Sequence, residues 1–189
     1  MLVGKNVRLR ILDSTDTEYM RRLRNSPDVI RGFQWRNFIS DVRQAAFYES
    51  VSVSSEQMYF IAESLHEAQP FGVYFIRNLD HRNQRGENGV FLDPQRTTTG
   101  VESIEAAFLL LEYEFTYLNL HKVCAEVLSE NTRAIRFNEA IGMQCEGVLR
   151  QHVYYDGAFR DLSQFCLFRD DFLNRPTPVI RSLLATRKT

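Results

Sequence analysis

Residues 101–127 read VESIEAAFLLLEYEFTYLNLHKVCAEV, and this stretch decides the fold. Apolar residues recur at helical spacing from Ile104 to Phe115, while glutamates such as Glu105 fall on other faces of the same helix. From Val123 the period changes to the alternation of a strand. The stretch therefore predicts one long helix that leads directly into a strand.

Further strands are predicted on both sides of this helix. Alternating, aromatic or β-branched residues favour strands at 7–12, 57–62, 69–78, 85–93, 153–155 and 161–168. Asp156-Gly157 joins the last two as a tight hairpin turn. Strands before and after a long helix, with a hairpin at the end, predict a mixed sheet flanked by helices.

Shorter helices are predicted from their capping signals. The three-residue spacing of Thr15 and Glu18 is typical of a capping box, and Ser26 before Pro27 predicts a second helix start. A third helix is expected over 41–51. Another, over 131–141, is expected to end at Gly142, which suits a left-handed cap.

The composition predicts one globular domain. The chain has 189 residues, of which 44% are hydrophobic, which is enough for a proper core. We assign residues 1–175 to a single domain and 176–189 to a C-terminal tail that is either helical or disordered. With 23 Lys and Arg against 24 Asp and Glu, no positive excess favours nucleic acid or an anionic membrane as partner.

Three cysteines, Cys124, Cys145 and Cys166, are odd in number and widely spaced, which fits neither a disulfide framework nor a metal site. We interpret them as reduced, mostly buried thiols, and we predict no metal ligands. The longest apolar run, at 106–111, is far shorter than the roughly 20 residues of a membrane-spanning helix. These features favour a cytoplasmic protein.

Three stretches, in order and spacing, carry a resemblance to a known family. They are VRLR (7–10) with RNSPDV (24–29); NLDHRN (78–83) with Glu87, LDP (92–94), IEA (104–106) and LNLHKV (118–123); and NTRAIR (131–136) with Gly142, Glu146-Gly147 and Asp156-Gly157. Over about residues 5–172 the chain resembles the GNAT superfamily of N-acetyltransferases, especially the branch of the RimJ, RimL and spermidine acetyltransferases.

The resemblance implies an α+β fold with a mixed, mostly antiparallel sheet of six to seven strands and helices on both faces. In that family the fourth strand splays from the fifth, and its free amides hold the pantetheine arm of acetyl-CoA and polarise the thioester carbonyl. The corresponding strand here is 89–92. Its predicted donor-binding residues are Val90, Phe91 and Leu92, with the amide of Phe91 at the thioester.

The loop after this strand corresponds to the family's pyrophosphate loop, which binds through backbone amides and a helix N-terminus. The predicted contacts here are Arg96, Thr97, Thr98, Thr99, Gly100 and Val101. The family pattern has more glycine, so the threonines make a close approach of phosphate harder, and Glu102 lies where the pyrophosphate is expected.

A second departure from the family is at Asn138, where many members carry a tyrosine that protonates the leaving thiolate. Asparagine has no titratable proton to give. Some members of the RimJ and RimL branch also lack this tyrosine. The proton source is therefore open, with water, another hydroxyl, or the distant Tyr154 and Tyr155 as candidates.

Glu87, Asn131 and Arg136 complete the predicted site, each with a structural alternative. Glu87 matches a glutamate that helps to deprotonate the amine, directly or through water, and the structural alternative is a strand-edge carboxylate paired with Arg82 or Arg85. Asn131 matches a contact to the pantetheine arm and would also cap its helix. The resemblance implies that Arg136 can reach the nucleotide phosphate, although arginine is common on an exposed helix face.

We expect an N-acyltransferase that moves an acetyl or other short acyl group from coenzyme A to a primary amine of a small molecule or a protein N-terminus. Two alternatives stay open. The altered loop and Asn138 are also compatible with a GNAT-like binding or regulatory module without donor, and with a donor carried on an acyl carrier protein. Family members often pair as dimers, and the sequence leaves the acceptor undetermined.

Overall fold

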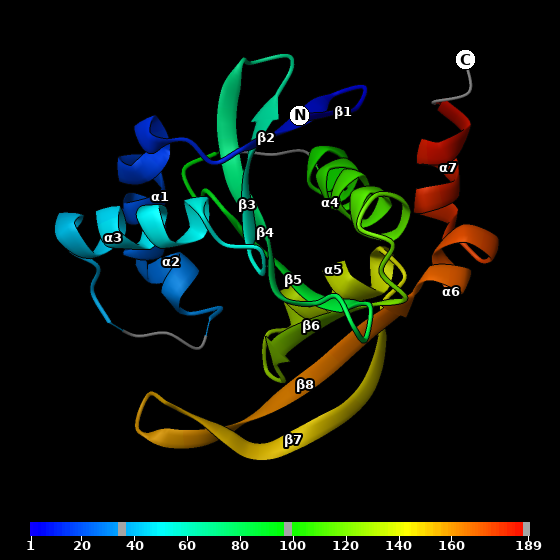
Figure 1. Cartoon of the computed structure of the whole chain (residues 1–189). Coiled ribbons are helices and arrows are strands. Elements are labelled where there is room, and N and C mark those ends of the chain that lie inside the picture. Colours follow the sequence, from blue (N-terminus) through cyan, green and yellow to red (C-terminus); the bar gives the residue numbers. More distant parts are fainter. Residues whose placement is uncertain (34–36, 97–99, 187–189) are drawn as a thin grey trace.

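The computed structural model describes residues 1–33, 37–96 and 100–186, whose arrangement is shown in Figure 1. The strands are β1 (Leu2–Val3), β2 (Val7–Ile11), β3 (Met58–Ser64), β4 (Gln69–Asp80), β5 (Arg85–Leu92), β6 (Lys122–Leu128), β7 (Gln144–Tyr155) and β8 (Ala158–Phe168). The helices are α1 (Thr17–Arg24), α2 (Pro27–Ile30), α3 (Asp41–Ser52), α4 (Gly100–Thr116), α5 (Thr132–Ala140), α6 (Arg169–Asn174) and α7 (Pro178–Thr186), with a short 3-10 helix at Ser14–Asp16.

The strands in the described residues form one eight-stranded sheet in the order β1-β2-β3-β4-β5-β6-β8-β7. Every neighbouring pair is antiparallel except β5 and β6, which run parallel. The mixed, mostly antiparallel sheet is therefore confirmed. The predicted count of six to seven strands was too low because β1, which pairs Leu2 with Leu9, has two residues and shows no alternation.

Helices cover both faces of the sheet, as predicted (Figure 1). The helix α4 packs on one face, in a core that also receives Phe165 and Ile180. The helices α1 to α3 cover the other face, where Leu23 and Val29 pack with strand residues. Tyr74 and Phe75 are neighbours in β4 and enter the two different cores, because successive strand residues point to opposite faces.

The first helix starts differently from the prediction. The capping box is formed by Asp13, which accepts from Thr15 N at 3.1 Å, and by Asp16, which accepts from Asp13 N at 2.9 Å. Glu18 instead accepts from Arg21 at 2.7 Å. The three-residue spacing was correct, but it belongs to residues two positions earlier. The helix α2 does begin at Pro27, as Ser26-Pro27 predicted.

Two glutamates of α4 are buried, including Glu105, which lies on another face of the helix than the apolar residues from Ile104 to Phe115. Glu105 is 3% exposed and accepts from the backbone amides of Lys5 and Asn6, so it binds the turn between β1 and β2 to the helix. Glu114 is fully buried, and Asn88 Nδ2 donates to its Oε2 at 3.3 Å, while its Oε1 has no partner within the described residues. Burial raises the pKa of Glu114 to about 8, so this carboxyl is protonated at neutral pH.

The C-terminal third of the chain contains more regular structure than its turn signals predicted. The predicted helix over 131–141 is α5, and Gly142 follows it with φ of +97°, which confirms the left-handed cap. The strand β7 begins already at Gln144 and forms with β8 a long ribbon that reaches away from the body (Figure 1). The tail contains the helix α7, whose Ile180 joins the main core.

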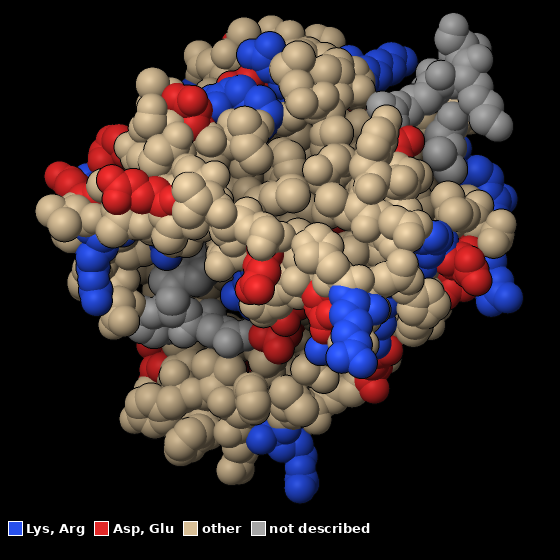
Figure 2. Space-filling model, viewed as in Figure 1, with Lys and Arg blue, Asp and Glu red and all other residues tan. Residues whose placement is uncertain are grey.

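The surface carries mixed charge. Figure 2 shows acidic and basic side chains interspersed on one face, in agreement with a formal net charge of −1. Within the described residues no helix is both long and apolar enough to cross a membrane. The thiols are free, as predicted, but only Cys166 is buried, whereas Cys124 is half-buried and Cys145 is exposed.

Candidate active site

The pairing of the two central strands β5 and β6 ends half-way along them. Their parallel register contains Arg85 with Lys122, Gly86 with Val123, and Glu87 with Cys124. The remaining residues of β5, 88–92, stay paired with β4 on their other side. Within the described residues, the ends of β5 and β6 therefore diverge beyond Glu87 and Cys124. This is the splay that was predicted.

The register with β4 decides which amides of β5 face the splay. Asp93 N donates to Phe71 O at 2.8 Å, so this pair is a hydrogen-bonded pair of the antiparallel ladder. Since such pairs alternate, Phe91 directs its amide to Val73 of β4, while Val90 and Leu92 direct theirs to the splay. The amides of Val90 and Leu92 are therefore directed to the splay, and the amide of Phe91 is not.

The side chain of Phe91 has a packing role. It is 3% exposed and meets Phe33 edge-on, with ring centroids 5.7 Å apart, and Phe75 at 6.1 Å. This cluster packs β5 against the layer of α1 to α3. Phe91 thus supports the strand whose neighbouring amides line the splay.

Glu87 lies at the apex of the splay, opposite Cys124. Its two oxygens accept from Arg77 Nε at 2.9 Å and from Asn78 Nδ2 at 3.0 Å, and its side chain is 26% exposed. The predicted structural partners, Arg82 and Arg85, are replaced by Arg77, which stands directly opposite in β4. The side chain is thus held by two donors and still reaches solvent.

The side of the splay formed by β6 leads into α5. Asn131 caps this helix, since its Oδ1 accepts from Ala134 N at 3.1 Å. A Cβ placed on Gly32 would lie 3.3 Å from Asn131 Nδ2, so the end of α2 meets the start of α5. Asn138, two turns further on in α5, is 7% exposed.

The predicted donor loop is partly described. Arg96 lies 4.0 Å from Glu67, and Gly100 and Val101 open α4. Thr97, Thr98 and Thr99 lie outside the described residues. The start of the loop is held by Asp93, which accepts from Arg22 at 2.6 Å and from Gln95 N at 3.0 Å.

Three other predicted residues lie on α5 and on the ribbon of β7 and β8. Arg136 is on an exposed face of α5. Tyr154 is 63% exposed near the tip of the β7–β8 ribbon, where it contacts Phe159, and Tyr155 is buried with Leu128 in a small separate core.

The structure adds residues that the sequence had not suggested. Arg77 bridges Glu87 and, at 3.7 Å, Glu126 of β6, so two carboxylates and one guanidinium share this face of the sheet. Next to them Lys122 Nζ donates to Glu146 at 2.6 Å. The hairpin turn at 81–84 pairs Asp80 with Arg85, and a register shift between Arg77 and Asp80 then brings Arg77 opposite Glu87, so the turn alone did not indicate the pair.

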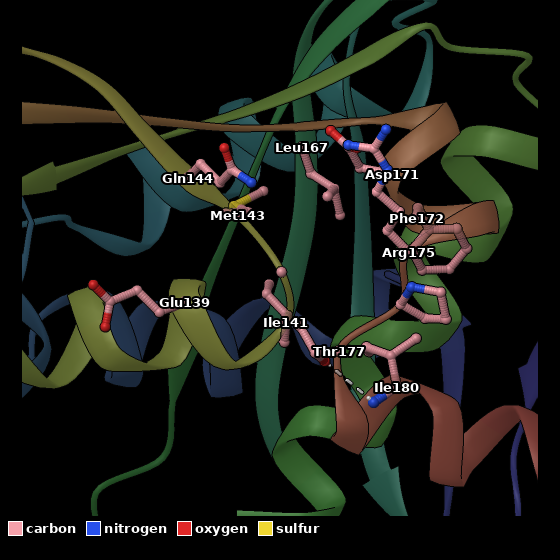
Figure 3. A pocket seen from close by; sticks show the side chains of 12 residues that line it. Glu139, Ile141, Met143, Gln144, Leu167, Asp171, Phe172, Arg175, Thr177 and Ile180 are labelled. Atoms are coloured by element: carbon pink, nitrogen blue, oxygen red, sulfur yellow. Dashed lines mark hydrogen bonds and ion pairs between the residues drawn. The ribbon is translucent and has the colours of Figure 1, made fainter.

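A separate pocket of about 250 Å³ lies among the end of α5, the start of β7 and the helices α6 and α7 (Figure 3). Its polar groups are engaged locally: Thr177 Oγ1 donates to Ala140 O at 2.9 Å, and Arg175 lies 3.6 Å from Asp171. None of the predicted site residues lines it. The open strand ends, rather than this pocket, therefore define the candidate site.

The comparison with protein families gives a direct match. Residues 6–144 match the family described as the acetyltransferase (GNAT) domain. The chain belongs to the GNAT acetyltransferase family. This confirms the resemblance on which the predicted site was based, and places the splay of β5 and β6 in the family's characteristic fold.

Relatives of this GNAT chain include a spermidine N(1)-acetyltransferase of Escherichia coli K12, 26% identical over 168 residues that cover 89% of each chain. A putative ribosomal N-acetyltransferase of Bacillus subtilis, YdaF, is 25% identical over 90% of this chain and 95% of its own length. The fold matches that of a spermidine N-acetyltransferase of Vibrio cholerae, solved with CoA and spermine, at a TM-score of 0.84 and 21% identity, over 89% of this chain and 99% of the other.

Proposed function

We propose that this protein transfers an acetyl group from acetyl-CoA to the primary amine of a small cationic molecule, with a polyamine as the first candidate. The observation that carries the proposal is the end of the β5–β6 pairing at Glu87 and Cys124. It leaves the amides of Val90 and Leu92 directed to a gap between strands, where an extended pantetheine arm can take the place of a neighbouring strand.

The gap suits the thioester as well as the arm. An amide fixed in a strand is a preorganised donor, and it stabilises the negative charge that develops on the carbonyl oxygen during attack. Val90 supplies this amide in the proposal. In the same proposal the amide of Leu92, two residues on, binds the arm, and the N-terminus of α4 binds the pyrophosphate.

The amine loses its proton on the side of Glu87. The carboxylate is held by Arg77 and Asn78, and because each oxygen has two lone pairs it can still accept from an ammonium or from a bridging water. The leaving thiolate is formed near α5, where the amide of Asn138 can donate a hydrogen bond but no proton. Water is therefore the proposed proton source.

The proposed acceptor class follows from charge and from relatives. Glu87 and Glu126 lie on the same face beside the splay, and carboxylates favour a cationic amine over a neutral one. The spermidine acetyltransferases among the relatives fit this class, whereas the putative ribosomal acetyltransferase would require a protein N-terminus. An assay with spermidine and with an N-terminal peptide, each with acetyl-CoA, separates the two.

Donor binding is the first test. We expect calorimetric titration to show binding of acetyl-CoA and of desulfo-CoA, because both carry the pantetheine arm and the pyrophosphate. Binding of a pantetheine analogue alone would replace coenzyme A by an acyl carrier protein as donor. If none of the three ligands binds, the chain is a GNAT-like binding module and the proposed reaction is wrong.

Glu87→Gln tests the base. We expect turnover to fall about 100-fold, since glutamine keeps the shape but accepts no proton, while affinity for acetyl-CoA stays nearly unchanged. Glu126→Gln is the matched control, because it removes the same charge from the other carboxylate that Arg77 contacts. An equal loss in both variants would mean that net charge, and not a base at Glu87, is responsible.

A further inference from the structure

Two of the three cysteines face each other across neighbouring strands. Cys124 of β6 is the register partner of Cys166 of β8. Two hydrogen bonds define the ladder on either side of them: Arg169 N donates to His121 O, and Ser129 N donates to Asp161 O. Hydrogen-bonded pairs therefore fall on the odd-numbered residues of β6, and Cys124 with Cys166 is a non-hydrogen-bonded pair.

This type of pair has the geometry that a disulfide requires. Directly opposite residues of a non-hydrogen-bonded pair have Cα atoms about 4.5 Å apart and side chains on the same face of the sheet. Disulfides span Cα separations of about 4.4–6.8 Å. Cys124 and Cys166 can therefore be joined without displacing either strand.

The pair also lies at the apex of the candidate site. Cys124 is the last β6 residue paired with β5, and its partner there is Glu87. The Cys166 thiol donates a hydrogen bond to Glu146, the carboxylate that Lys122 binds. A bond between the two sulfurs would thus connect β6 to β8 at the point where β6 leaves β5.

We propose that Cys124 and Cys166 are a site of reversible disulfide formation, with a low-molecular-weight disulfide as the oxidant. The Cys124 thiolate attacks one sulfur of the oxidant, forming a mixed disulfide and releasing one thiolate. Cys166, after losing its proton to solvent, attacks the Cys124 sulfur and releases the second thiolate. Two cysteines are oxidised, one small disulfide is reduced to two thiols, and an excess of small thiol reverses the reaction.

The surroundings of the thiols set the order and the speed of these steps. Cys124 is half-buried, whereas Cys166 is 4% exposed, so the oxidant reaches Cys124 first. Burial raises the pKa of both thiols, that of Cys166 to about 12. Since the thiolate is the nucleophile, the exchange is slow at neutral pH and faster at alkaline pH.

The test uses the whole chain with Cys145→Ser, which removes the exposed thiol that could form bonds between molecules. After incubation with oxidised glutathione at alkaline pH, we expect the thiols titrated in denaturant to fall from two to none and the intact mass to fall by two hydrogens. The thermal unfolding midpoint should rise by roughly 10 °C, because the bond closes a loop of about 40 residues. Dithiothreitol should reverse all three changes.

The variants Cys124→Ser and Cys166→Ser, in the same background, are the controls. We expect each to keep its remaining thiol or to gain one glutathione, without a rise in the unfolding midpoint. Two unreacted thiols, or glutathione on both cysteines of the parent, would overturn the proposal. Thiol titration needs no acyl donor or acceptor, so its result does not depend on the proposed reaction.

Discussion

Val90→Pro should fold and lose at least 100-fold in kcat/KM for acetyl transfer. Proline has no amide hydrogen, and the amide of Val90 is directed to the splay rather than to β4. The ladder with β4 is therefore kept, in the position where strands tolerate proline. Removal of one preorganised donor to a developing oxyanion costs about 10²–10³ in rate. Steady-state kinetics, with circular dichroism to check folding, measure both parts.

Two matched variants make this prediction specific to the amide. Val90→Ala removes more of the side chain but keeps the amide, so we expect it to retain most of the rate that the proline variant loses. Phe91→Pro removes an amide directed to Val73 and empties the contacts with Phe33 and Phe75, so it should fail to fold. A folded Phe91→Pro with normal stability would show that the assigned register is wrong.

Glu114→Gln should remove a loss of stability that develops between pH 4.5 and about pH 8. Burial raises the pKa of Glu114 from its ordinary value of 4.5 to about 8 in the folded chain. Between these values the folded state holds a proton that the unfolded state has released, so the free energy of unfolding falls as pH rises, by up to about 1.4 kcal/mol per pH unit. The contribution is complete below pH 4.5 and lost as pH rises through 8.

Urea unfolding of parent and variant at pH 5 and at pH 8 measures this effect. Glutamine is neutral at both pH values. The free energy of unfolding of the variant should therefore rise relative to that of the parent by a few kcal/mol on going from pH 5 to pH 8. Glu112→Gln makes the same change on the same helix at a half-buried position, and we expect no such gain. If the free energies of unfolding of Glu114→Gln and the parent differ by the same amount at both pH values, Glu114 is not protonated in the folded chain.

Local signals in the sequence predicted most elements. The helical period between Ile104 and Phe115, the start at Pro27 and the left-handed Gly142 each depend on residues within a few positions, and each is confirmed. The strand count of six to seven was below the observed eight because β1 has no pattern of its own. The first capping box was displaced because Asp13 competes with Thr15 for the same role.

For the residues of the site, the sequence indicated some features and the tertiary structure decided others. The sequence by itself placed the splay at residues 89–92, through the family resemblance, and identified Glu87, Asn131 and Asn138 as residues beside it. Only the tertiary structure decided that Val90, and not Phe91, offers its amide, that Arg77 holds Glu87, and that Glu114 is buried. The reason is that helical periods and caps come from contacts between residues close in sequence, whereas amide direction, ion pairing and burial depend on strand register and on which distant segments pack together.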